Sequence, residues 1–274
     1  MRGEFLDLGG ARLYYYAAGT RGAGEPVVFL HGFPTSSHLW NDVVPLMPAG
    51  HRLVVVDLLG YGRSDRPLAR PVDIRAHGAR IIELLDELRI PRACIVGHGM
   101  GGGIAQSLAI RYRDRVSHLC LVDSVAFGRW LAPGIRFARM ATPAIGLLPP
   151  AVILGILRRT LRNAYEDGDH AARSIDLYLR PFSDEPGREA LLTHLTALST
   201  AETTDLAPEL KTISVPTAIA WGEQDSVTPL SIGRQLQTAI PGASLDVIPG
   251  SRHFTPEEAP RKIADVIGDL LGRG

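Results

Sequence analysis

Residues 95–103 read Ile95-Val96-Gly97-His98-Gly99-Met100-Gly101-Gly102-Gly103, an apolar run that ends in a glycine-rich turn. The run is typical of a buried strand, and the residues after the turn fit the start of a helix. Glycine at position 99 suits a sharp turn, because it adopts positive φ without the strain of a side chain. The stretch therefore predicts a tight strand–turn–helix junction.

Short apolar runs recur on both sides of this junction, and each ends in polar residues or glycine. Such near-continuous runs are typical of parallel strands buried on both faces. The predicted strands are Pro26 to Leu30, Arg52 to Asp57, Ala93 to Gly97, His118 to Asp123, Thr217 to Trp221 and Ser244 to Ile248. A hairpin is expected before them, from Phe5–Asp7 and Arg12–Ala17.

Helical patterns alternate with these strands. Apolar residues at helical spacing form two stripes, namely Ala79, Ile82, Leu85 and Leu88, and Ile263, Val266, Ile267 and Leu270. Alternation of this kind predicts an α/β fold with a doubly wound, mostly parallel sheet.

The interval between Asp123 and Thr217 breaks the alternation, because its patterns are mainly helical. Structureless loops of that length are rare in compact domains. We therefore predict a core domain of residues 1–125 and 208–274 and a helical cap domain of residues 126–207, inserted over the carboxyl edge of the sheet. Bulky cap residues are candidates for a substrate pocket or for packing within the cap. They are Phe127, Trp130, Phe137, Met140, Tyr165, Tyr178 and Phe182.

The composition is that of an ordinary globular protein. The chain has 274 residues, of which 45% are hydrophobic and 21% charged, and its 29 basic side chains balance 29 acidic ones. No basic field is present to attract nucleic acid or a membrane. No apolar segment fits a signal peptide or a membrane span, so we expect a cytoplasmic protein. A small-molecule substrate is the expected partner, and a homodimer remains open.

Five motifs, in order, resemble those of the α/β-hydrolase superfamily. They are Leu30-His31-Gly32-Phe33-Pro34, Asp57-Leu58-Leu59-Gly60-Tyr61-Gly62-Arg63-Ser64, Gly97-His98-Gly99-Met100-Gly101, Trp221-Gly222-Glu223-Gln224-Asp225 and Gly250-Ser251-Arg252-His253-Phe254. The third motif is similar to the nucleophile elbow G-x-S-x-G, with glycine in place of the reactive residue. The resemblance covers the whole chain except the cap and implies an α/β-hydrolase fold.

The resemblance also implies the roles of five residues. His253 is the expected base, and Asp225 is the acid that orients it. The backbone amides of Phe33 and Met100 are the expected oxyanion hole. Gly99 stands where the family carries its nucleophile, and losing a nucleophile from a triad costs on the order of a millionfold in rate.

Residues next to these have structural alternatives. Asp123 is a reserve acid, although capping of a turn is the favoured role. Thr255 is predicted to cap the helix that starts at Pro256, with Glu258 completing a capping box. His31 and His98 are expected to support their loops.

The residue that Gly99 replaces stays open. Serine would indicate esterases, lactonases and carbon–carbon hydrolases, and aspartate would indicate epoxide hydrolases and dehalogenases. The sequence around Phe33 slightly favours the aspartate branch, in which Tyr165 or Tyr178 could open an epoxide. Met100 stands where haloalkane dehalogenases commonly have tryptophan, which argues against haloalkanes as substrates.

Three functional hypotheses follow. The first is a hydrolase of small esters, lactones or epoxide-like compounds in which Gly99 is an engineered inactivation or a natural variant. The second is an enzyme that needs no nucleophile and uses His253 and Asp225 for elimination, cyclisation, lyase chemistry or direct attack by water. The third is a member that binds a small ligand without catalysis. No cofactor and no metal is implied, and a hydrolase elbow explains residues 97–102 better than a dinucleotide-binding turn does.

Overall fold

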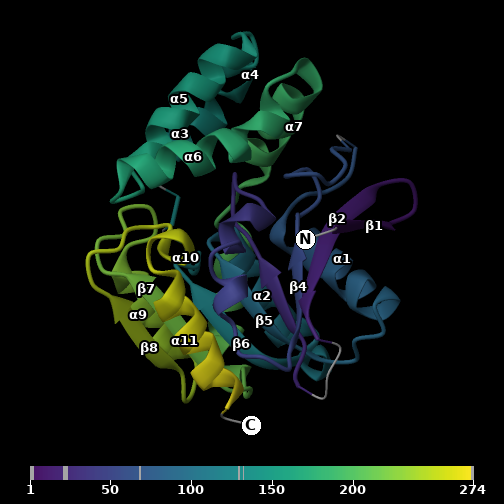
Figure 1. The fold of residues 1–274 in the computed structure, drawn as a ribbon. Helices are drawn as coiled ribbons and strands as arrows, with labels where there is room; N and C mark the ends of the chain where they lie inside the picture. The colour runs from purple at the N-terminus through teal and green to yellow at the C-terminus, as the bar shows by residue number, and fades with distance from the viewer. Residues whose placement is uncertain (1–2, 21–23, 68, 129, 132, 273–274) are drawn as a thin grey trace.

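A computed structural model describes residues 3–20, 24–67, 69–128, 130–131 and 133–272 (Figure 1). Within these residues the chain forms one eight-stranded sheet. The strands are β1 (Gly3–Asp7), β2 (Arg12–Gly19), β3 (Val27–Leu30), β4 (Arg52–Val56), β5 (Ala93–His98), β6 (Val116–Val122), β7 (Thr217–Gly222) and β8 (Ser244–Ile248).

The strand order is β1-β2-β4-β3-β5-β6-β7-β8. The pairs β1–β2 and β2–β4 are antiparallel, and the pairs from β4 onward are parallel. β3, β5, β6 and β7 are buried along their whole length, which explains their continuous apolar sequences. The predicted α/β fold with a mostly parallel sheet is confirmed.

Helices pack along the strands. α1 (Ile74–Glu87) packs on α2 (Met100–Arg111), which in turn contacts β3, β5 and β6. α9 (Leu230–Ala239) packs on β7 and β8, while α11 (Pro260–Leu271) packs on β6 and β7 and crosses in front of the sheet in Figure 1. The short α10 (Thr255–Glu258) precedes α11. The sheet is thus held between helices that connect its strands.

Between β6 and β7 the chain forms helices that lie beyond one edge of the sheet, at the top of Figure 1. They are α3 (Pro133–Met140), α4 (Thr142–Ile145), α5 (Pro150–Arg162), α6 (Gly168–Leu179) and α7 (Glu185–Ala197), and α8 (Ala201–Leu206) leads back to the sheet. We call residues 126–207 the helical insertion. Short 3₁₀ helices complete the fold at Ser37–Trp40, Val44–Leu46, Arg113–Arg115, Arg180–Phe182 and Ala207–Thr212. Among the described residues, no helix has the length and apolar character needed to cross a membrane.

Candidate active site

Gly99 joins β5 to α2 with φ 54° and ψ −121°. This region is strained for a residue with a side chain and open to glycine. A Cβ placed on Gly99 would lie 3.6 Å from the Cα of Gly32 and 3.8 Å from Nε2 of His253. The backbone of an elbow is therefore present, with room for a side chain that would face the imidazole.

The imidazole of His253 is held by Asp225. Nδ1 of His253 lies 2.8 Å from Oδ2 of Asp225, and both side chains are buried. Asp225 also accepts the amides of Val227 at 2.7 Å and Thr228 at 2.9 Å, and the Thr228 hydroxyl donates to Oδ2 at 2.6 Å. These bonds fix the carboxylate, which in turn fixes the ring and leaves Nε2 directed at position 99.

Burial and charge shift the pKa values of His253 and Asp225 in opposite directions. Burial alone would lower the pKa of His253, but the negative charge of Asp225 and the hydrogen bond to it outweigh burial and raise that pKa above its ordinary value. Burial would raise the pKa of Asp225, but His253 and the donors from Thr228 lower it. Each partner therefore stabilises the charged form of the other.

Asp123 has a different environment. It is fully buried and accepts the Gly222 amide at 2.8 Å and the Thr255 hydroxyl at 2.5 Å, which ties the residue after β6 to the last residue of β7 and to the first residue of α10. Burial raises the pKa of its carboxyl well above the usual range. The predicted cap at Thr255 is wrong, because its hydroxyl bonds Asp123 and the residue before α10 is Phe254. The acid next to His253 is Asp225.

The loop before Phe33 lies against the elbow. A Cβ on Gly32 would come within 3.2 Å of the Met100 amide nitrogen and 3.1 Å of the His98 carbonyl oxygen. Met100 is the first residue of α2, where an amide has no acceptor within the helix. The Phe33 loop and the Met100 amide thus border Gly99, as an oxyanion site requires. His98 supports the neighbouring loop, since its Nε2 lies 2.8 Å from the His253 carbonyl oxygen.

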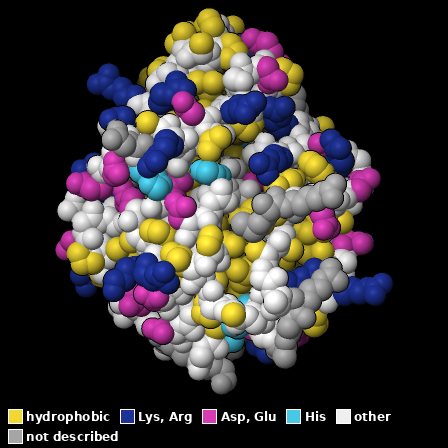
Figure 2. Space-filling view, viewed as in Figure 1, with side chains coloured by type: hydrophobic (Ala, Val, Ile, Leu, Met, Phe, Trp, Pro, Cys, Tyr) yellow, Lys and Arg dark blue, Asp and Glu magenta, His cyan; other side chains and the backbone are white. Residues whose placement is uncertain are grey.

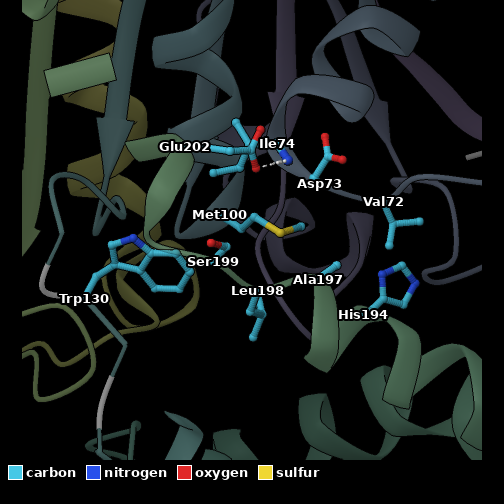
Figure 3. Close-up of a pocket in the computed structure, with 10 residues that line it drawn as sticks. All are labelled: Val72, Asp73, Ile74, Met100, Trp130, His194, Ala197, Leu198, Ser199 and Glu202. Carbon is cyan, nitrogen blue, oxygen red and sulfur yellow. Dashed lines mark hydrogen bonds between the residues drawn. The ribbon is translucent and has the colours of Figure 1, made fainter. Parts of the chain in front are cut away.

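A small cavity adjoins Met100 (Figure 3). Its volume of about 10 Å³ is roughly that of one water probe. Trp130 and His194 lie at opposite ends in Figure 3, with Met100 between them. Glu202 and Asp73 border the cavity too, but they serve the start of α1, where Glu202 accepts the Ile74 amide at 3.0 Å and Asp73 accepts the Ala76 amide at 2.8 Å.

His194 is a buried histidine whose ring lies 4.0 Å from that of Tyr61, centroid to centroid. Burial lowers its pKa to about 3. The unfolded chain therefore binds a proton that the folded chain does not, and stability falls as the pH drops below about 6.5. The slope is about 1.4 kcal/mol per pH unit, so His194 alone removes roughly 2 kcal/mol between pH 6.5 and 5.

We expect His194→Gln to remove this contribution. Between pH 7 and 5, the free energy of unfolding of the variant should change by roughly 2 kcal/mol less than that of the wild type, because glutamine does not titrate. Urea unfolding of both proteins at the two pH values measures this difference. Comparing each protein with itself cancels any constant effect of the substitution on packing. Equal pH dependence in the two proteins would contradict a neutral buried His194.

The bulky residues of the helical insertion have several environments. Phe137 and Met140 are 72% and 83% exposed, so the expectation that they line a pocket is wrong. Figure 2 shows apolar side chains at the top of the molecule, over α4 and α5. Trp130 lines the cavity and donates through Nε1 to the Thr203 hydroxyl at 2.8 Å. The hydroxyls of Tyr165 and Tyr178 both donate to Glu257 and are not free to act on a substrate in this conformation.

Sequence analysis missed Thr228 and Glu257. Thr228 follows Asp225 by three residues and donates to it, a spacing that is common in turns where a carboxylate accepts a nearby amide or hydroxyl. That spacing was a usable signal. Glu257 had none, because its tyrosine partners lie 79 and 92 residues away in the sequence.

The part of the chain that the structure describes contains no group of three or more His, Cys, Asp or Glu side chains able to hold a metal ion. Around Gly99 the structure brings together the imidazole of His253, the carboxylate of Asp225 that holds it, and the loop of Gly32.

Known proteins resemble this chain over nearly all of its length. An uncharacterized hydrolase of Bacillus subtilis, YugF, is 28% identical over 96% of this chain and 95% of its own. Haloalkane dehalogenase 2 of Mycobacterium tuberculosis is 28% identical over 98% of this chain and 94% of its own. The crystal structure of an alpha/beta hydrolase fold protein from Burkholderia ambifaria is 27% identical, with a TM-score of 0.85, over 98% of this chain and all of its own.

The sequence profile of the alpha/beta hydrolase family matches residues 27–266, which include every strand of the parallel part of the sheet and the whole site. The protein is therefore a hydrolase-type member of the alpha/beta hydrolase family.

Proposed function

We propose that this protein hydrolyses a small ester or lactone without a covalent intermediate. His253, oriented by Asp225, is the general base, and a water at the position of a residue-99 side chain is the attacking group. The observation that carries the proposal is the 3.8 Å separation between Nε2 of His253 and a Cβ placed on Gly99. Together with the 2.8 Å bond to Asp225, this puts an oriented base beside space for one small molecule.

In the first step, the water oxygen bonds to the substrate carbonyl carbon while Nε2 of His253 takes the water proton. The negative charge that develops on the carbonyl oxygen is stabilised by the amides of Phe33 and Met100. Asp225 stabilises the imidazolium ion. The intermediate then collapses, the carbon–oxygen bond to the leaving group breaks, and His253 returns the proton to the departing alkoxide. The products are a carboxylic acid and an alcohol.

The tyrosine contacts favour a carbonyl substrate over an epoxide. Opening an epoxide needs an acid at the ring oxygen, and the candidate donors Tyr165 and Tyr178 are hydrogen-bonded to Glu257. An ester needs donors only at its carbonyl oxygen, which backbone amides supply.

His253→Ala is expected to reduce kcat/KM on responsive esters or lactones by about 10²–10⁴-fold, the usual contribution of a general base. In the wild type, kcat should rise with pH through a pKa above the ordinary range of histidine, because His253 must lose its proton to act. A panel of small esters and lactones, followed by product detection, measures both effects. His51→Ala is the control, since His51 bonds the Glu25 carbonyl at the opposite edge of the sheet and should leave the rate unchanged.

A single turnover in ¹⁸O-labelled water distinguishes hydrolysis from reactions that add no water, and the absence of a burst of alcohol separates direct attack from an acyl-enzyme route. Direct attack puts one labelled oxygen into the carboxylic acid. A product without solvent oxygen would assign His253 to elimination or cyclisation instead. Stabilisation by a ligand with no product, or an unchanged rate in His253→Ala, would overturn the proposal.

A further inference from the structure

The carboxylate of Glu257 joins the helical insertion to the loop that carries His253. Glu257 lies in α10, is 5% exposed, and accepts the hydroxyls of Tyr165 and, at 2.7 Å, Tyr178. The Ser174 hydroxyl bonds it as well. A buried carboxylate needs such donors, because burial penalises its charge and raises its pKa.

These contacts belong to a longer interface between residues 164–166 of the insertion and residues 252–258. The His253 amide donates to the Ala164 carbonyl at 3.1 Å, so the backbone of the base itself is tied to the insertion. Glu258 accepts the Glu166 amide at 2.5 Å and the Arg252 amide at 2.7 Å, and Arg252 pairs with the Glu166 carboxylate at 2.9 Å. Residues 164–166 and 252–258 are therefore hydrogen-bonded along their length.

Aromatic rings extend this interface toward the imidazole of His253. Tyr165 stacks on Phe254 with centroids 4.0 Å apart and planes 12° apart. Phe254 meets His253 edge to face at 5.4 Å. The ring of Phe254 thus lies in contact with both Tyr165 and the base.

We propose that Glu257, with Tyr165 and Tyr178, is a positioning group for His253, so that the bond between His253 and Asp225 depends on where the helical insertion sits. This inference rests on the proposed role of His253 as the base. The groups lie on three separate segments, α10, the turn at Tyr165 and α6, and none of the three needs to touch the substrate. A substrate that displaces the insertion to reach Gly99 would therefore also move the base, and full alignment would return only when the insertion closes.

Tyr178→Phe and the double variant Tyr165→Phe/Tyr178→Phe test the proposal, because phenylalanine keeps the rings and removes only the donors. The readout is the titration of His253, followed by NMR of ¹⁵N-labelled histidine, which needs no substrate. We expect the pKa of His253 to fall toward the ordinary histidine value as its bond to Asp225 loosens. We also expect hydrogen exchange at the His253 amide to quicken at least tenfold.

Tyr15→Phe is the matched control, since the Tyr15 hydroxyl also donates to a glutamate, Oε2 of Glu4, at 2.7 Å, but on the far hairpin. It should leave both readouts unchanged. Glu257→Gln supplies a second perturbation if the double variant does not fold. If His253 titrates and exchanges as in the wild type in Tyr178→Phe and in Glu257→Gln, the proposal is wrong. Turnover that depends on His253 would then still support the proposed function, and a protein with no turnover would still give a valid titration.

Discussion

Gly99→Ser is expected to hydrolyse small activated esters at least about 100-fold faster than the wild type, because it would supply a covalent route that is worth more than the rest of the site alone. The new Cβ would lie 3.6 Å from Gly32 and 3.8 Å from Nε2 of His253, both ordinary contacts. The hydroxyl would then face a base that Asp225 already orients. Alcohol release should show a burst, the kinetic sign of an acyl-enzyme.

The same substitution should destabilise the fold. A residue with a side chain at φ 54° costs roughly 1–3 kcal/mol, which lowers Tm by several degrees in a chain of this size. Gly99→Ala separates the two effects, since it carries the strain without the hydroxyl. It should match the serine variant in Tm and show no burst.

Two further variants complete the comparison. Gly99→Ser/His253→Ala should lose the gained activity. Gly99→Asp should instead favour alkyl-enzyme chemistry on epoxides or haloalkanes. Comparing the activities of the serine and aspartate variants therefore shows which class of substrate the pocket accepts. No gain from either serine or aspartate across a broad panel would contradict the expectation that a side chain at position 99 can act as a nucleophile beside His253.

Gly101→Ala is expected to destabilise the protein by about 3 kcal/mol or more, at the upper end of the cost of overpacking a core, because the overlap is with backbone atoms. A Cβ on Gly101 would overlap the Leu30 carbonyl and lie 2.6 Å from the His31 carbonyl oxygen. These atoms are backbone at the end of β3, so no side-chain rotation relieves the overlap. α2 would have to move away from the sheet, and the elbow with it.

Gly155→Ala is the matched control, because Gly155 is also helical but has no atom within 4 Å of its Cβ position. That substitution should stabilise the protein by roughly 0.5–1 kcal/mol, the ordinary preference of a helix for alanine. Urea unfolding of the two variants and the wild type measures both effects. Similar values for the two alanine variants would show that α2 and β3 do not approach as closely as described.

The central strands could be predicted because burial on both faces keeps their sequences apolar. Thr217 to Trp221 was predicted as a strand, and β7, which is buried along its whole length, begins at the same residue and ends one residue later. The face of α1 could be predicted only in part. In the expected stripe Leu85 is buried and Ile82 and Leu88 pack against the core while partly buried, but the fully buried face also carries His77, Gly78 and Ile81. Gly78 allows close approach to Leu108 of α2, with a Cβ position 3.7 Å from its side chain, and this tertiary contact decides the face.

The candidate site likewise has one part that could be predicted from the sequence and one part that could not. Motifs within a few residues of a strand end, such as those of Gly99, Asp225 and His253, could be predicted to meet because parallel strands place their carboxyl ends at one edge. The partners of Tyr165 and Tyr178 could not, because they depend on how a separate set of helices settles on that edge. The sequence left the two tyrosines open as epoxide-opening groups or as packing residues of the cap, and their hydroxyls bond Glu257.

The bond from the His253 amide to the Ala164 carbonyl affects whether helical insertions can be exchanged between members of this family. Helical insertions look like exchangeable modules, since they begin and end at neighbouring strands. Here a carbonyl of the insertion accepts the backbone amide of His253, the residue that carries the imidazole. A chimaera that takes its insertion from a relative would inherit new substrate contacts and a displaced base together, unless the donor segment also reproduces the chain path of residues 163–166.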